Sequence, residues 1–210
     1  VDFLDGIYTL AANGDVNART GIGVHMYSAT ASMDRRYFQN SDGEMLIVPQ
    51  SGPIRVRTEL GVVHAEPREI VLISRSVKFA VDVPSGESTG YICENYGAPF
   101  ELPELGPIGA NGLAHARHFR HPVAAFEQDL GEVELVQKFG GHLWSCTLPD
   151  SPLDVVAWHG SHGVYVYDLE QFNVMGTTNW DHADPSIHTV LSSPSPIPGQ
   201  ANVDFCAFGP

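Results

Sequence analysis

The residues best suited to proton chemistry lie together in the segment 179–186. There His182 stands between two carboxylates, those of Asp181 and Asp184, and Pro185 follows directly. A neighbouring carboxylate can hold an imidazole in one tautomer and raise its basicity, which is the arrangement of a positioned general base. The same residue types also fit a surface loop with a turn at Asp184-Pro185, so the local sequence leaves both interpretations open.

Other histidines could bind a metal ion, and three of them recur every third residue, at His115, His118 and His121. On a helix these three side chains would share roughly one face. Pro122 and the glycine-rich residues before them leave little room for a helix, and neighbouring arginines add positive charge, so we predict a solvated loop rather than a metal site. His159 has no carboxylate at a matching distance, and we expect it to hydrogen-bond to backbone groups.

No two of the ten histidines are separated by a single residue, the spacing that places two ligands on one face of a strand. Cupin jelly rolls often bind a metal through such a pair together with a nearby carboxylate. Residues 66–79 resemble the second cupin motif, but Phe79 stands where a metal-binding cupin usually has histidine. The sequence therefore indicates a cupin-like domain that holds no metal.

The elements that must position these residues are mostly strands. Between residues 22 and 96 we count six or more short strands, with turn residues every eight to twelve positions and almost no helical periodicity. This pattern predicts a mainly β fold, a cupin-like jelly roll or β-sandwich with long loops and few short helices. The clearest of these strands are 44–50, 54–60, 62–65, 69–73, 77–83 and 91–96.

After these strands the chain changes character. Residues 97–122 are rich in glycine and proline and predict a long ordered loop, a kind of loop that is often functional. Strands resume at 133–139 and 142–147, on either side of a Gly140-Gly141 hairpin turn. Two more strands are expected further on, at 187–191 and 201–208.

We divide the chain into a metal-free cupin-like domain at 1–122 and continuing strands with the start of a second, C-terminal part at 123–210. One domain overall is the alternative. Val1 is preceded by no initiating methionine or signal segment, and the chain stops directly after a strand-like run. We therefore expect both termini to be internal to a longer protein.

Composition limits the partners. The 210 residues are 43% apolar and only 17% charged, enough to bury one sizeable core, and the formal net charge of −14 disfavours both nucleic acid and anionic membranes. No apolar run is long enough to span a membrane. The three cysteines are widely spaced among apolar residues, which predicts buried thiols, no disulfide framework and a reducing, cytoplasmic location.

Four segments, taken together and in order, resemble the homogentisate 1,2-dioxygenase family. They are Asn40–Gln50, Phe100–Ala114, Val155–Gly160 and Asp181–Ser186, and the similarity runs along essentially the whole chain. By motif match, His182 corresponds to the loop histidine that takes the hydroxyl proton of the substrate in this family. The resemblance thus favours the general-base interpretation, with the two neighbouring carboxylates in support.

The resemblance also implies an activity, a cofactor and an assembly. The family cleaves the ring of homogentisate with O₂, giving maleylacetoacetate, in tyrosine and phenylalanine catabolism. It uses non-heme Fe(II) held by two His and one Glu, and these ligands lie beyond the position of Pro210, so we expect no metal ligand in this chain. The family assembles as hexamers of paired trimers, which implies a homo-oligomer. These 210 residues alone should then be inactive.

Two further functions stay open. The chain could be a metal-free cupin scaffold or a small-molecule-binding module without activity of its own. It could also belong to a cupin isomerase or to another dioxygenase that acts on a related ring. Downstream sequence would distinguish these functions, because a His followed a few residues later by Glu, with another His further on, supports homogentisate cleavage.

Overall fold

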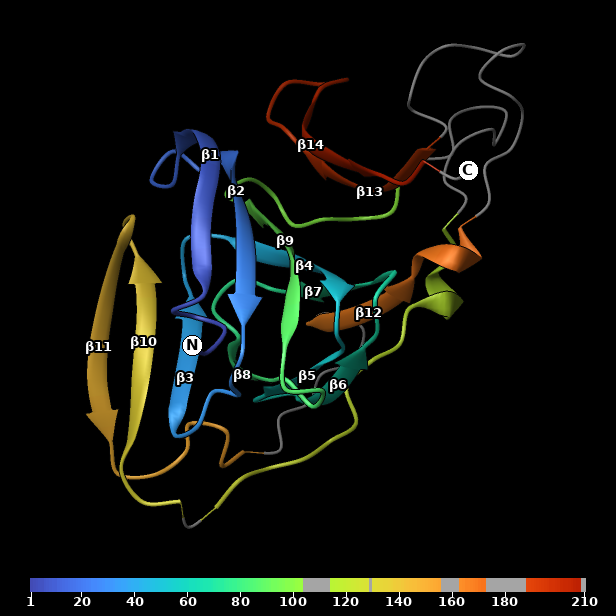
Figure 1. The fold of residues 1–210 in the computed structure, drawn as a ribbon. Coiled ribbons are helices and arrows are strands. Elements are labelled where there is room, and N and C mark those ends of the chain that lie inside the picture. The colour runs from blue at the N-terminus through green and yellow to red at the C-terminus, as the bar shows by residue number, and fades with distance from the viewer. Residues whose placement is uncertain (104–113, 129, 156–162, 173–187, 209–210) are drawn as a thin grey trace.

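The computed structural model describes residues 1–103, 114–128, 130–155, 163–172 and 188–208, and most of their regular structure is β-sheet (Figure 1). The described residues form two six-stranded sheets and a two-stranded ribbon. Within the described ranges, two single-turn 3₁₀ helices, η1 and η2, interrupt the strands. The elements are β1 Ile7–Asp15, β2 Thr20–Ala29, β3 Arg36–Asn40, β4 Glu44–Ser51, β5 Ile54–Thr58, β6 Gly61–Ala65, β7 Glu69–Ile73, β8 Lys78–Asp82, β9 Ser88–Asn95, η1 Ala116–His118, β10 Val133–Phe139, β11 His142–Leu148, β12 Val164–Asp168, η2 Leu169–Gln171, β13 Thr189–Pro194 and β14 Ala201–Cys206.

Strands β2 to β9 form a jelly roll. Four of them lie in the order β2-β9-β4-β7 in the first sheet, and the other four lie in the order β3-β8-β5-β6 in the second sheet. Every connection within this set except the β5–β6 hairpin crosses from one sheet to the other, which is the arrangement of two Greek keys. The predicted mainly β, jelly-roll fold class is confirmed. Strands β1 and β12 extend the first sheet, and β10 and β11 extend the second.

The sequence pattern explains which faces of the strands are buried. In β5 buried and half-buried residues alternate, because one face of this strand packs on the core and the other meets solvent. In β4 Met45, Leu46 and Ile47 are all buried, because both faces of the first sheet are covered. The jelly roll therefore has an inner and an outer apolar layer.

The inner core fills the space between the two sheets. It contains Phe79, which is fully buried against the rings of Phe3 and Phe38, so the position that carries histidine in metal-binding cupins is a packing position here. The outer cluster lies on the other face of the first sheet, on the side where Figure 1 shows the β13–β14 ribbon. Its buried members are Leu46, Ile70, Leu72, Cys93, Phe100, Ala114, Tyr167, Val190 and Leu191.

The predicted hairpin at 133–147 is confirmed as β10 and β11. Its turn uses Gly140 and Gly141, both in the left-handed region with φ of 63° and 77°, where other residues are strained. The Asp42 carboxylate accepts both glycine N–H groups, at 2.7 and 2.8 Å, and anchors the turn to the jelly roll. Since β10 and β12 pair with β3 and β7, residues after 123 extend both sheets, and the domain boundary at 122 stays a prediction.

Several details differ from the sequence-based expectation. Strands β1, β2, β3 and β12 were not among the strands predicted by residue range, and β13 runs on to Pro194, past the predicted end at 191. The expectation of buried thiols was wrong for Cys146, which is exposed because it lies on the edge strand β11. Cys93 is buried, which raises the pKa of its thiol to about 11, and no cysteine forms a disulfide. No helix within the described ranges is long and apolar enough to cross a membrane.

Candidate functional site

The residues predicted to carry the chemistry, His182, Asp181 and Asp184, fall in segment 173–187, outside the described residues. His159 also falls outside them. Their roles therefore stay predictions. The structure does describe the residues on either side of segment 173–187 and the surface on which they lie.

Both described ends of that segment pack into the outer cluster. Phe172, the last residue before the segment, lies against the cluster, and Leu191, near the start of β13, is one of its buried members. Phe100 and Ala114, on either side of segment 104–113, belong to the same cluster. The outer face of the first sheet is thus where two long segments of the chain start and end.

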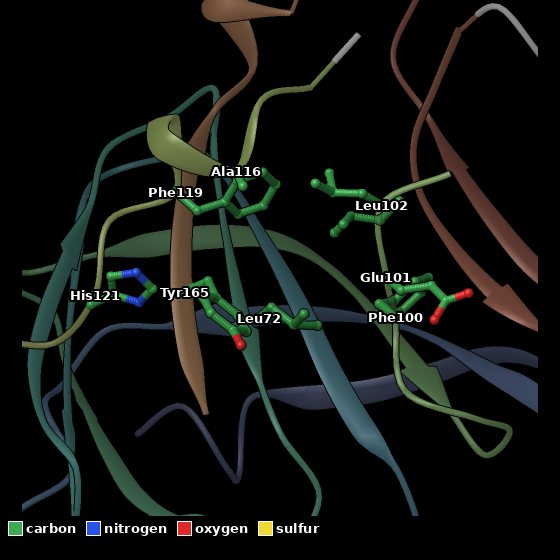
Figure 2. Close-up of a pocket in the computed structure, with 9 residues that line it drawn as sticks. Leu72, Phe100, Glu101, Leu102, Ala116, Phe119, His121 and Tyr165 are labelled. Carbon is green, nitrogen blue, oxygen red and sulfur yellow. The ribbon is translucent and has the colours of Figure 1, made fainter. Parts of the chain in front are cut away.

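A cavity of about 280 Å³ opens in this outer cluster (Figure 2). Figure 2 shows Phe119 and Tyr165 on one side of the cavity and Phe100 and Leu102 on the other. The ring of Phe119 stacks on that of the buried Tyr167, with 4.5 Å between ring centroids, and this contact restrains the Phe119 side chain. The lining is mostly aromatic and aliphatic, with two polar side chains at its edge. The lining residues are Leu72, Phe100, Glu101, Leu102, Ala116, Phe119, His121, Tyr165 and Leu191.

The three closely spaced histidines do different things. His115 caps η1, where its Nδ1 accepts the N–H of Arg117 at 3.3 Å. Its ring centroid lies 5.7 Å from that of His118. His121 lines the cavity, with its ring centroid 5.5 Å from that of Tyr165. The described part of the chain contains no group of three or more His, Cys, Asp or Glu side chains that could hold a metal ion.

A buried ion cluster lies on the inner side of the first sheet, and the sequence analysis missed it. Glu94 on β9 accepts hydrogen bonds from His25 Nε2 at 3.0 Å and Asn40 Nδ2 at 2.7 Å, and it forms an ion pair with Lys138. Burial alone would raise the pKa of the Glu94 carboxyl, but the His25 hydrogen bond and the Lys138 ammonium outweigh burial and lower this pKa to about 2. Glu94 is therefore ionised at neutral pH.

A second buried carboxyl, that of Glu44, behaves differently. Glu44 lies on β4, and its Oε2 accepts the N–H of Phe100 at 2.7 Å. Burial raises its pKa to about 7, and the contacts from Phe100, Asn95 and Arg75 offset this only in part. Near neutral pH the Glu44 carboxyl is therefore partly protonated.

His188 is another residue that the sequence analysis passed over. It is buried just before β13, and its ring centroid lies 4.4 Å from that of Phe208. Among the described residues, neither ring nitrogen has a hydrogen-bond partner. Such a buried polar group is costly to leave unpaired. The available signal was weak, because one histidine in an otherwise apolar strand is usually a packing residue.

We tested whether the interior of the jelly roll fits the iron implied by the sequence resemblance. A mononuclear Fe(II) site of this type needs two His and one carboxylate with open positions. The ion cluster offers one His and one Glu, and both Glu94 oxygens already bind His25, Asn40 or Lys138. Phe79 occupies a core position with no ligand atom. The described interior does not fit the metal.

The fold defines a mainly β, jelly-roll sandwich protein. Comparison with protein families matches residues 1–169 to "Homogentisate 1,2-dioxygenase N-terminal" and residues 170–210 to "Homogentisate 1,2-dioxygenase C-terminal". The chain belongs to the homogentisate 1,2-dioxygenase family, and the resemblance seen in the sequence is confirmed.

The solved structures that match part of this chain include two cupin chains and an oxalate decarboxylase. A cupin-2 domain protein from Shewanella frigidimarina is 11% identical, with 42% of this chain and 78% of that chain covered, at a TM-score of 0.35. A cupin domain from Bordetella pertussis is 15% identical, with 44% and 92% covered, at 0.34. Oxalate decarboxylase from Bacillus subtilis is 6% identical, with 46% and 29% covered, at 0.34.

Proposed function

We propose that this chain is part of an enzyme that opens the ring of homogentisate with O₂ to give maleylacetoacetate. The observation that carries the proposal is the family match, which runs along the chain from the N-terminal part of the family into its C-terminal part. Jelly-roll folds serve many functions, so the fold alone would not select this reaction.

His182 is the proposed proton acceptor. It lies within residues 170–210, matched to the C-terminal part of the family, and the sequence places Asp181 and Asp184 beside it. One of these carboxylates would hold the imidazole in the tautomer whose free nitrogen faces the substrate hydroxyl. Taking that proton makes the ring electron-rich, which prepares it for oxidation.

The proposed cofactor is Fe(II), with ligands from residues outside these 210. When bound, the iron would supply the site where substrate and O₂ meet. The task of this chain would be to hold the substrate ring, exclude water from it and accept its proton. The cavity in the outer cluster supports these roles, because its lining is mostly aromatic and aliphatic and because the described residues on either side of segment 173–187 pack in the same cluster.

We also propose a cytoplasmic homo-oligomer. The β11 edge strand supports subunit contact, because it has no partner on its outer side among the described residues and exposes Leu143 and Trp144. Free thiols suit a reducing compartment. Sedimentation analysis of the protein from its complete natural reading frame should give a single species larger than a monomer.

The reaction is tested with that same protein, loaded with Fe(II). We expect O₂ uptake and formation of maleylacetoacetate in equal amounts when homogentisate is added. Ring-opening of gentisate instead, which lacks the extra methylene of the acetate group, would show that the substrate assignment is wrong. An iron-loaded protein that consumes no O₂ with either compound would indicate a binding or scaffold module.

A further inference from the structure

A second hollow lies on the outer face of the first sheet, and nothing above assigns it a function. This groove, of about 790 Å³, lies between the β1–β2 turn, the β7–β8 turn and the β13–β14 ribbon. Arg19 lines it from the first turn and Arg75 from the second, and Glu44 reaches it from β4.

The walls of the groove are fixed by hydrogen bonds. Asn202 on β14 accepts the N–H of Gly21 at 2.7 Å and donates to the carbonyl of Gly21 at 3.1 Å, which ties the ribbon to β2. Ser193 on β13 donates to the carbonyl of Ala98 at 2.7 Å, which ties the ribbon to the loop after β9. The groove is therefore shaped before any ligand arrives, which reduces the entropy lost on binding.

Among the described residues, the two arginines of the groove have no ion-pair partner. Arg75 donates to the carbonyls of Tyr96 and Gly97, at 2.8 and 3.1 Å, and neither Arg75 nor Arg19 forms an ion pair with any described residue. Burial lowers the pKa of Arg75 first, and the charge of Arg19 lowers it further, so the two guanidiniums act on each other.

The chain has 25 acidic and 11 basic side chains, so carboxylates that could neutralise a cation are abundant. Glu44 lines the groove, and burial raises the pKa of its carboxyl to about 7, which weakens its repulsion of an incoming anion. Asp42 and Glu94 also act on the charge of Arg75, and both carboxylates accept hydrogen bonds from other groups. Two guanidiniums with free N–H groups suit an oxyanion that accepts from both.

We propose that this groove binds a small organic anion, whose carboxylate or phosphate group lies between the Arg19 and Arg75 guanidiniums. The proposal does not depend on the ring-cleaving activity. The rest of the ligand would contact the small and proline-rich walls of the groove.

The test is calorimetric titration of the full chain with sodium citrate and, separately, sodium phosphate, at ionic strength held constant with NaCl. The key variant is Arg19→Asn. Arg19 has φ of 54°, a left-handed conformation that Asn adopts readily, and its side chain makes no bond that the fold needs. Arg117→Gln removes an equal charge from an exposed position outside the groove and serves as the control.

We expect saturable binding of at least one anion by the wild-type chain. Loss of one charge-assisted contact in Arg19→Asn should weaken that binding about tenfold or more, whereas Arg117→Gln should change it less than about twofold. Response to citrate alone assigns a carboxylate ligand, and response to phosphate alone assigns a phosphate ligand. The proposal is overturned by no saturable binding of either anion, or by equal effects of Arg19→Asn and Arg117→Gln.

Discussion

The two faces of the first sheet hold two buried glutamates that differ in charge. Glu94 and Glu44 lie on neighbouring strands, where Glu94 pairs with Met45 and Glu44 pairs with Asn95. Their exposed fractions are 2% and 5%, so burial is nearly the same. Yet the pKa of Glu94 is lowered to about 2 and that of Glu44 is raised to about 7.

The difference lies in the partners. Glu94 points toward the second sheet, where His25 and Lys138 reach it, whereas Glu44 points to the outer face, where no cation lies within ion-pair distance among the described residues. Burial sets the penalty on a charge, and only specific partners remove it. The inner face therefore holds a structural ion cluster whose charges are paired. The outer face carries the cavity, the groove and the described residues on either side of the segment that contains His182.

The largest expected effect on stability comes from breaking the inner cluster. Glu94→Gln leaves the Lys138 ammonium largely buried without its counter-charge, and we expect a loss of about 3–5 kcal/mol in the free energy of unfolding. Denaturant unfolding at pH 7 measures this loss. A change below about 1 kcal/mol would show that the cluster does not stabilise the fold.

A double variant sharpens that experiment. Lys138→Met removes the cation. The double variant Glu94→Gln/Lys138→Met should therefore lose much less free energy of unfolding than the sum of the losses in the two single variants. The wild-type contribution of Glu94 should be present above its ordinary pKa of 4.5 and be lost as the pH falls toward 2, because the unfolded chain takes up the proton first.

Glu44 should show the opposite dependence on pH. Its pKa in the folded chain lies above its ordinary value of 4.5, so the unfolded chain loses the proton first and this group makes the fold less stable as the pH rises from 4.5 to about 7. Glu44→Gln removes that trend and should gain up to about 3 kcal/mol relative to wild type between pH 4 and pH 8. Parallel curves of unfolding free energy against pH for the two proteins would contradict the raised pKa.

A smaller effect is expected at the cavity. Phe119→Leu removes the ring that stacks on Tyr167 but keeps an apolar side chain, so the fold should persist. We expect the KM for homogentisate to rise about fivefold, equivalent to about 1 kcal/mol, with little change in iron content. Phe126→Leu, at an exposed ring outside the cavity, is the matched control. Equal KM values for the two variants would remove the cavity from the substrate site.

Local pattern was enough to predict much of the jelly roll. Alternation in β5, continuous apolar runs in β4 and β7, and glycine turns at Gly61 and Gly140 gave the central strands and two hairpins. Strand β1 was not predicted, because most of its residues are exposed and its sequence contains Ala-Ala-Asn-Gly, which is not typical of a strand. Strand β12 was not predicted, because it pairs with β7, about ninety positions earlier in the sequence, and no local pattern marks such a pairing.

The two glutamates show why sites are harder to predict than strands. Glu94 meets His25 and Lys138 across 69 and 44 residues of sequence, so no local spacing marks the cluster. One usable signal for a buried ion cluster was the charge of Glu94, because this residue follows Tyr91-Ile92-Cys93 in a strand buried on both faces. His182 was predicted from its flanking carboxylates and the family motif, and its place in space lies outside the described residues.

The central proposal is that His182, in a segment whose described neighbours Phe172 and Leu191 pack in the outer cluster, accepts a proton for a metal centre that the described jelly-roll interior does not fit. The most direct test compares iron content and turnover of wild type and His182→Gln in the protein from its complete reading frame. We predict equal iron content and turnover lower by about 10²- to 10⁴-fold, because only the proton acceptor is lost. Turnover within twofold of wild type, or loss of iron in His182→Gln, would contradict the claim.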